Sequence, residues 1–297
     1  MRRAGGAVAS FRGPAKGMGE PESSLLNPAL EPLVEVAVTI QFEPLDALKS
    51  AHIGLLWGHA YRKNLPGIEE HPPAPHVIEL ENPQLQSSDT PRIRISEKPE
   101  VPRFFFISES GDELIQVQND RFSCNWRRRG DDYNYPRYPK IRDSLGERFA
   151  AFRSFVEREK LGEVSPNQVE IVYVNHILYG PGRDAHGRLG ELIKPWSAEF
   201  TSLGGAHLQD VRIHTQHVLA SRSGEFLGRL HVDVVPAYLK ANMTPLYKIE
   251  LAGRGKPIGG GVEGALGFLD FAHERLVAAF GELFSDATQN TWKGRHA

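Results

Sequence analysis

The pattern of apolar and polar positions predicts one order of elements twice along the chain: a strand, a helix, three strands and a long helix. Residues 34–42 alternate apolar side chains with polar or small ones, which is the period-2 pattern of a half-buried strand. Apolar residues then recur at near-helical spacing between Leu45 and Leu56, and Pro66-Gly67 ends that run. The first two elements are therefore expected to be a strand and a helix.

Three strands and a long helix complete the first unit. The strands are expected at residues 103–108, 114–119 and 121–127, with Gly111-Asp112 and Asn119-Asp120 supplying the turns between them. The helix is expected over residues 138–161, where apolar residues such as Phe149 and Phe152 form a stripe at helical spacing.

The second unit repeats this order from residue 168 onward. Its expected elements are a strand at 168–178, a short helix at 189–196, strands at 211–220, 226–235 and 246–252, and a long helix from about residue 262. We predict an α+β fold in which two strand–helix–three-strand–helix repeats form a largely antiparallel sheet with the long helices on one face. The halves, residues 25–164 and 165–297, would pack as one pseudo-symmetric unit. Because they share no residue-level identity, the duplication is a hypothesis from element order alone.

Composition and charge limit the classes of function. The chain is 40% hydrophobic and 24% charged, an ordinary globular balance. Its net charge of −2 argues against a dedicated nucleic-acid binder, which usually carries a strongly basic face. Cys124 is the only cysteine, so no intramolecular disulfide can form, and neither a secretory pattern nor a membrane-length apolar run occurs. We therefore predict a cytoplasmic protein that does not span a membrane.

Three segments lack periodicity. Residues 1–24 are rich in Gly, Pro, Ser and Arg, which predicts a disordered tail. Residues 71–92 carry five prolines and are predicted to form a mobile loop. Residues 253–261 are rich in glycine and are interpreted as a flexible connector, because Lys256 is followed by Pro257 and the glycine spacing does not match a phosphate-binding loop.

Several short segments resemble a sporadically distributed bacterial protein family of unknown function, over about residues 25–292. The resemblance is carried by Asn27-Pro28 ahead of the first strand, Leu56-Trp57, the Gln-x-Gln at 116–118 followed by Asn125-Trp126-Arg127, Tyr135-Pro136, and the ending Asp270-x-x-His273…Trp292. It implies a stand-alone, patchily inherited bacterial protein, so a mobile-element, defence or accessory gene cluster is a plausible setting. No catalytic residue can be carried over from it.

The strands predict a continuous polar sheet face. Side chains alternate between the two faces of a strand, so the polar side chains separate from the apolar ones in both halves. The polar set is Gln116, Gln118, Ser123, Asn125, Arg127, Arg229, His231 and Asp233, and the apolar set is Ile115, Val117, Phe122, Cys124, Trp126, Leu230, Val232 and Val234. Three interpretations remain open: a solvated face, a groove that recognises a ligand or partner, and a catalytic floor.

A basic and aromatic segment adjoins this face. It contains Trp126, Arg127, Arg128 and Tyr135, with Tyr133, Arg137 and Tyr138 close by in the sequence. Such residues bind nucleic acids, but they are also the favoured anchors of protein interfaces. Our leading hypothesis is a binding or regulatory module that engages a protein partner, with nucleic acid less favoured and a small-molecule ligand or homo-oligomer possible. The predicted binding residues are Gln116, Gln118, Asn125, Trp126, Arg127, Arg128, Tyr135 and Arg229.

An enzyme is the alternative hypothesis. His231 and Asp233 lie two apart in a strand and therefore point the same way, and His214 or His217 could join them from the neighbouring strand. These are the catalytic candidates, as an acid-base pair or a metal site, although no metal or cofactor is assigned. Cys124 lies on the predicted buried face and should be inert. On the last helix, His273 is either part of a charged surface or a titratable contact with the other half.

Overall fold

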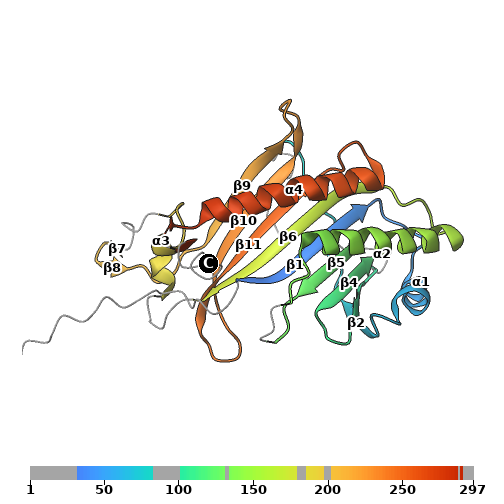
Figure 1. Cartoon of the computed structure of the whole chain (residues 1–297), viewed down its shortest axis with the longest axis horizontal. Helices are drawn as coiled ribbons and strands as arrows, with labels where there is room; N and C mark the ends of the chain where they lie inside the picture. The colour runs from blue at the N-terminus through green and yellow to red at the C-terminus, as the bar shows by residue number, and fades with distance from the viewer. Residues whose placement is uncertain are drawn as a thin grey trace, which may run out of the picture.

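The computed structural model describes residues 32–82, 101–130, 134–178, 185–196, 202–286 and 288–289. Within these residues the chain forms an antiparallel nine-stranded sheet in the order β2-β3-β4-β5-β1-β6-β11-β10-β9, shown in Figure 1. The strands are β1 (Leu33–Phe42), β2 (Gly67–His71), β3 (Arg103–Ile107), β4 (Glu113–Gln118), β5 (Arg121–Arg127), β6 (Pro166–Leu178), β9 (Ile213–Ala220), β10 (Phe226–Tyr238) and β11 (Pro245–Gly255). Strands β7 (Ser202–Leu203) and β8 (Ala206–His207) form a separate pair. The predicted α+β class and the large antiparallel sheet are confirmed.

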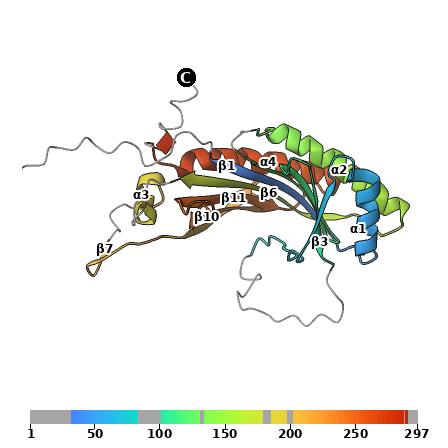
Figure 2. The ribbon, with the colours of Figure 1, turned by 90° about the horizontal axis from the view of Figure 1, so that it is seen from below.

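The helices of the described residues differ widely in length. They are α1 (Ser50–Leu56), which continues as the π-helical turn η1 (Trp57–Tyr61), α2 (Tyr138–Arg158), the 3₁₀ turn η3 (Ala185–Arg188), α3 (Leu189–Leu192) and α4 (Gly261–Leu283). Helix α2 contacts β1 and β5, and α4 contacts β6, β11 and β10. Figure 2 shows both long helices on the same side of the sheet. The opposite side is therefore left to the polar side chains.

Phenylalanines form the centre of the core between α2 and the sheet. Phe42, Phe122, Phe149 and Phe152 are fully buried. Their ring centroids lie between 5.4 and 6.2 Å apart, within the range of favourable aromatic pairs. Truncating one such ring to alanine typically costs about 3–5 kcal/mol, so this cluster fixes the helix layer onto the strands.

Two glycines let α4 pack closely on β11. A Cβ atom at Gly253 would lie 2.9 Å from Cβ of Ala272, and one at Gly255 would lie 2.4 Å from a ring carbon of Phe268. Both glycines belong to β11, which runs through Gly255. The interpretation of residues 253–261 as a flexible connector is therefore wrong for its first three residues, where glycine serves close packing.

Strand β2 was not expected from the sequence. Its five residues, Gly67–His71, follow Pro66 and include Glu69 and Glu70, so they carry no apolar alternation. The strand pairs with β3 at the edge of the sheet. Charged residues are common on edge strands because they discourage pairing with other chains. Residues 67–71 therefore form a strand because they pair with β3, and their local sequence does not favour one.

Part of the predicted organisation stays untested. The tail at residues 1–24 lies outside the described residues, as do Asn27-Pro28, Tyr133 and Trp292. The division into halves at residue 164 and the duplication remain predictions. No helix among the described residues is both long and apolar enough to cross a membrane.

Candidate functional site

Residues 72–82, which follow β2, cross the polar face of the sheet, and we call this segment the strap. Figure 2 shows the chain after β2 on the side of the sheet away from α2 and α4. Hydrogen bonds connect the strap in turn to Gln118 on β4, Arg121 on β5, Gln41 on β1, Gln168 on β6 and Arg229 on β10. These eleven positions have no regular secondary structure, as the predicted loop requires, but the sheet binds the main chain of six of them: Ala74, Pro75, Val77, Glu79, Leu80 and Glu81. The mobility of the loop stays a prediction. Residues 83–92 of that loop lie outside the described residues.

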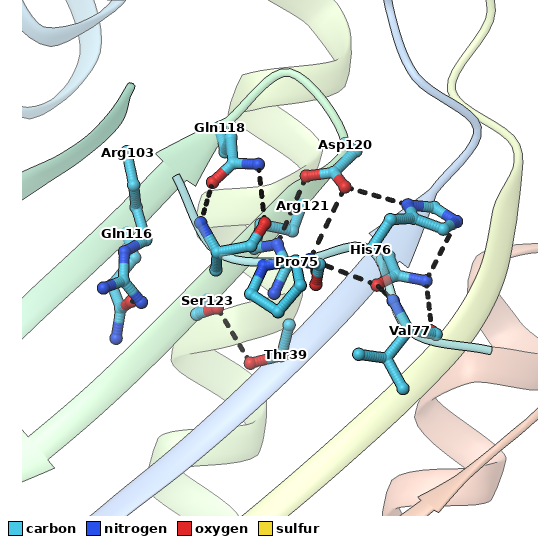
Figure 3. A network of polar contacts seen from close by, with 12 residues as sticks. Thr39, Pro75, His76, Val77, Arg103, Gln116, Gln118, Asp120, Arg121 and Ser123 are labelled. Carbon is cyan, nitrogen blue, oxygen red and sulfur yellow. Dashed lines mark hydrogen bonds and ion pairs between the residues drawn. The ribbon is translucent and has the colours of Figure 1, made fainter. Parts of the chain in front are cut away.

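Glutamine side chains on the sheet form hydrogen bonds to the main chain of the strap, and we call this set of contacts the glutamine grip. Oε1 of Gln118 accepts the Ala74 N–H at 2.8 Å, and Nε2 donates to the Ala74 carbonyl at 3.1 Å (Figure 3). Gln41 repeats this double contact with Val77, at 3.1 Å to N–H and 2.7 Å to the carbonyl. Oε1 of Gln168 accepts the Glu79 N–H at 3.1 Å. Because the glutamines bond to backbone groups, they can bind an extended chain largely independently of its side chains.

A short ion-pair chain fixes the middle of the strap. Nδ1 of His76 lies 2.8 Å from Oδ2 of Asp120, and Asp120 also accepts a hydrogen bond from Nε of Arg121 at 3.2 Å. The same arginine donates to the Pro75 carbonyl at 2.5 Å (Figure 3). The Asp120 side chain is 6% exposed. A buried carboxylate thus organises both a strap side chain and the arginine that binds the strap backbone.

A buried glutamate anchors the far end of the strap. Oε1 of Glu79 lies 2.7 Å from Nη1 of Arg229, and Oε2 lies 3.1 Å from Nε2 of His231 and 3.8 Å from Nη1 of Arg254. Arg229 also donates to the carbonyls of Leu80 and Glu81. Burial alone would raise the pKa of Glu79, but hydrogen bonds from His231 and Arg229 outweigh it and hold the pKa below its usual range. The carboxylate therefore stays charged inside a cationic cluster.

The strap does not fill the space below it. A cavity of about 180 Å³ lies between Pro75 and Val77 on the strap and the sheet residues Gln41, Arg121 and Gln168. Nε2 of Gln168 is buried and has no hydrogen-bond partner among the described residues. A buried donor without an acceptor costs about 1–3 kcal/mol. The strap is therefore an imperfect occupant of this face.

Beyond the strap, the polar face continues as a ladder of side chains. Arg103 donates to Gln116 at 3.1 Å, Gln116 to Asn125 at 2.9 Å, and Asn125 to Glu35 at 2.8 Å. The buried Nε atoms of Arg103 and Arg127 lack partners among the described residues. Burial lowers the pKa of both arginines from its usual value. This end of the face thus presents half-buried cations whose hydrogen bonds are incomplete.

The predicted binding residues divide between two faces. Gln118 and Arg229 bind the strap, while Gln116 and Asn125 belong to the ladder. Arg127 and Arg128 lie half-buried at the end of β5 and just beyond it. Trp126 is 3% exposed and packs against Tyr135 with ring centroids 5.1 Å apart. Trp126 and Tyr135 belong to the hydrophobic core and its edge.

The structure brings two of the catalytic candidates, His214 and Asp233, into contact, and the ring centroids of His214 and His231 lie 6.1 Å apart. Asp233 pairs with His214 across the β9–β10 register, at 2.8 Å between Oδ1 and Nδ1. His231 instead contacts Glu79 of the strap, and His217 bonds to Thr215. Among the described residues no group of three His, Cys, Asp or Glu side chains could hold a metal. Burial raises the pKa of Cys124 to about 12, in keeping with an inert thiol.

Several strap-site residues were not singled out from the sequence, among them His76, Asp120 and Arg121. Gln41 and Gln168 continue the polar alternation of their strands and could have been placed on the polar face from that pattern, as could Arg254. Glu79 lies in a proline-rich loop, where no periodicity indicates a buried side chain.

The chain matches no protein-family model, no curated protein and no solved structure. The resemblance to a bacterial family therefore stays a prediction. The case for a function depends on the contacts of the polar face.

Proposed function

We propose that this protein is a binding or regulatory module that engages an extended segment of a protein partner on its polar sheet face, and that the strap occupies the face when the partner is absent. The observation that carries this proposal is the glutamine grip: Gln118 and Gln41 each bond both main-chain groups of one strap residue. Hydrogen bonds to main-chain groups are a general source of affinity for extended peptides.

The contacts of the strap indicate which features a partner segment would need. Main-chain contacts at the positions of Ala74, Val77 and Glu79 demand an extended backbone but few particular side chains. The exceptions are His76, whose ring contacts Asp120, and Glu79, whose carboxylate neutralises a cluster built from Arg229, His231 and Arg254. We therefore expect a proline-tolerant, extended segment with one acidic residue at the position of Glu79.

The imperfect fit of the strap supports a regulatory role. The cavity of about 180 Å³ and Nε2 of Gln168, which has no hydrogen-bond partner within the described ranges, leave interactions that a better ligand could make. A tethered segment competes at an effective concentration in the millimolar range. Only a partner that binds the polar face more tightly than the strap would displace it. The strap therefore sets the minimum affinity that a partner needs.

We also propose that the two halves descend from a duplication. The sheet order supports this, because β1 leads through β5, β4 and β3 on one side while β6 leads through β11, β10 and β9 on the other. Each half then ends in a long helix. The setting in an accessory or defence gene cluster is likewise a proposal, supported by the predicted family resemblance alone.

A trans-binding experiment tests the function. A fluorescein-labelled peptide with the sequence of residues 72–82 is titrated with full-length wild type and with Glu79→Gln, and fluorescence anisotropy is measured. The Glu79→Gln strap is weakened while the sheet face is unchanged, so the peptide should bind this variant at least tenfold more tightly than wild type. A peptide carrying Gln in place of the glutamate that corresponds to Glu79 should lose that gain.

The matched control is Glu81→Gln, because the Glu81 side chain is exposed and only its backbone contacts the sheet. This variant should behave as wild type. If the peptide binds none of the proteins although hydrogen exchange shows the Glu79→Gln strap detached, the polar face is not a peptide-binding surface and the proposal is wrong.

A further inference from the structure

A second cavity lies on the opposite face of the sheet, between the N-terminal end of α2, helix α4 and strands β1 and β6. Its volume is about 460 Å³, inside the range of roughly 300–1,000 Å³ typical of small-molecule sites. Leu33, Leu251, Leu276 and Phe280 are among its apolar lining residues. The sheet separates the strap from this cavity, so a ligand in the cavity would not contact the strap.

One wall of the cavity is a chain of aromatic polar groups. The Tyr173 hydroxyl lies 2.7 Å from Nδ1 of His273 and also shares a hydrogen bond with Tyr135. The His273 ring stacks on Tyr138 with centroids 3.9 Å apart and planes 12° apart. The Tyr138 hydroxyl donates to Asp270 at 2.7 Å. These contacts hold the wall in one arrangement before any ligand arrives.

The aromatic wall carries no net charge near neutral pH. Burial lowers the pKa of His273, against the opposing influence of Asp270 and Glu274, so the imidazole is neutral. Burial raises the pKa of Tyr173, so this phenol keeps its proton. Asp270 is already paired with Arg142, whose Nε and Nη2 both lie 3.1 Å from its oxygens. The wall therefore supplies hydrogen bonds and an apolar surface without a charge.

Arg137 is the charged residue of the lining. No carboxylate among the described residues lies within ion-pair distance of its guanidinium, which stands 5.8 Å from the Tyr135 ring centroid. Its backbone has φ 72° and ψ 153° at the position before α2. Glycine is nearly the only residue that adopts this region, and such strain concentrates at functional sites. A strained cation that has no carboxylate partner in the described part of the chain, beside a largely apolar cavity, indicates an anionic ligand.

We propose that this cavity binds a small organic anion, with an apolar ring or short chain against Leu276 and Phe280 and a carboxylate or similar group at Arg137. The neutral Tyr135–Tyr173–His273 chain can donate or accept a hydrogen bond beside the anion without repelling it. The mouth is open to ligand entry near Val277, a lining residue that is 56% exposed.

The test uses full-length protein and the fluorescent anion 1-anilinonaphthalene-8-sulfonate, with octanoate and octanol as competitors. Wild type should bind one probe molecule, and octanoate should displace it at least tenfold more effectively than octanol. Val277→Trp should abolish binding by filling the mouth. Binding unaffected by Val277→Trp would place the probe elsewhere and overturn the proposal.

Arg137→Gly is the decisive variant. Glycine tolerates the positive φ, so the protein should melt at the same temperature or higher while its affinity for the probe falls about tenfold with the loss of the charged donor. The matched control is Lys160→Gly, which also replaces a cation of positive φ (54°) and lies beyond the other end of α2. Equal affinity of Arg137→Gly and Lys160→Gly for the probe would refute a role for Arg137 and with it the anion site.

Discussion

Replacing Glu79 with glutamine should detach the strap from the sheet while leaving the fold intact. The Glu79 side chain is 2% exposed and that of Arg229 is 5% exposed, so their 2.7 Å ion pair is shielded from water. Glutamine keeps the size of the side chain but removes the charge, and its amide nitrogen cannot accept a hydrogen bond from Arg229 or His231. The far end of the strap thereby loses its main attachment.

Two considerations set the expected loss in unfolding free energy of Glu79→Gln. Removing one partner of a buried ion pair costs about 3–5 kcal/mol when the other charge remains buried. Detachment of the strap would instead let water reach Arg229, so the measured loss in unfolding free energy should fall below that range. Arg229→Met should give a similar loss. The double variant should lose little more, because the second change acts on a strap that is already detached.

Urea unfolding gives the three free energies, and hydrogen exchange measured by mass spectrometry reports on the strap itself. The amides of Ala74, Val77 and Glu79 should lose protection in each variant, whereas the β1 and β6 amides should keep theirs. Glu81→Gln is the control and should change neither measurement. Additive losses with the strap amides still protected would refute the reasoning, because the cluster would then stabilise the sheet without holding the strap.

Three further changes have expected outcomes. Since the pKa of Glu79 is depressed in the folded protein, its stabilisation of the strap is present above the unfolded pKa of about 4.3 and is lost as pH falls through the folded pKa; strap proteolysis should rise below about pH 4, and a rise beginning near pH 7 would contradict this. The Cys124 thiol should not react with Ellman's reagent at pH 8 until urea unfolds the protein, because it is 2% exposed and burial raises its pKa; rapid labelling of folded protein would contradict this assignment. Gly255→Ala should destabilise the protein by about 1–3 kcal/mol through overpacking against Phe268 and the Leu227 carbonyl, and an unchanged urea midpoint would show that α4 moves away without cost.

The sequence predicted the sheet faces because alternation is a local property. Leu230, Val232 and Val234 are buried as expected, and Arg229 and His231 lie on the other side. The same alternation placed Phe122, Cys124 and Trp126 in the core. Each of these positions follows from the period of an extended strand, so no tertiary information was needed.

The strap could not be predicted in the same way. Its contacts use main-chain groups of Ala74 and Val77, which every residue except proline possesses, so the sequence of the loop carries no signature of them. Its two specific side chains meet distant partners: His76 contacts Asp120 across 44 positions of sequence, and Glu79 contacts Arg229 across 150. Prolines at 72, 73 and 75 indicated only an extended segment without regular pairing. The glutamines of the sheet hold the main chain of that segment, and the Arg229 and His231 side chains hold its far end through Glu79.

Strand β6 links the two proposed sites and also keeps them apart. Gln168 and Glu170 face the strap side, whereas Val169, Ile171 and Tyr173 point toward the helices, in the strict alternation of one strand. A one-residue slip in the register of β6 would exchange the two sets and destroy both sites together. Substitutions that preserve register should separate them. Gln168→Ala should affect the strap and leave anion binding unchanged, because a side chain on one face does not touch the cavity on the other.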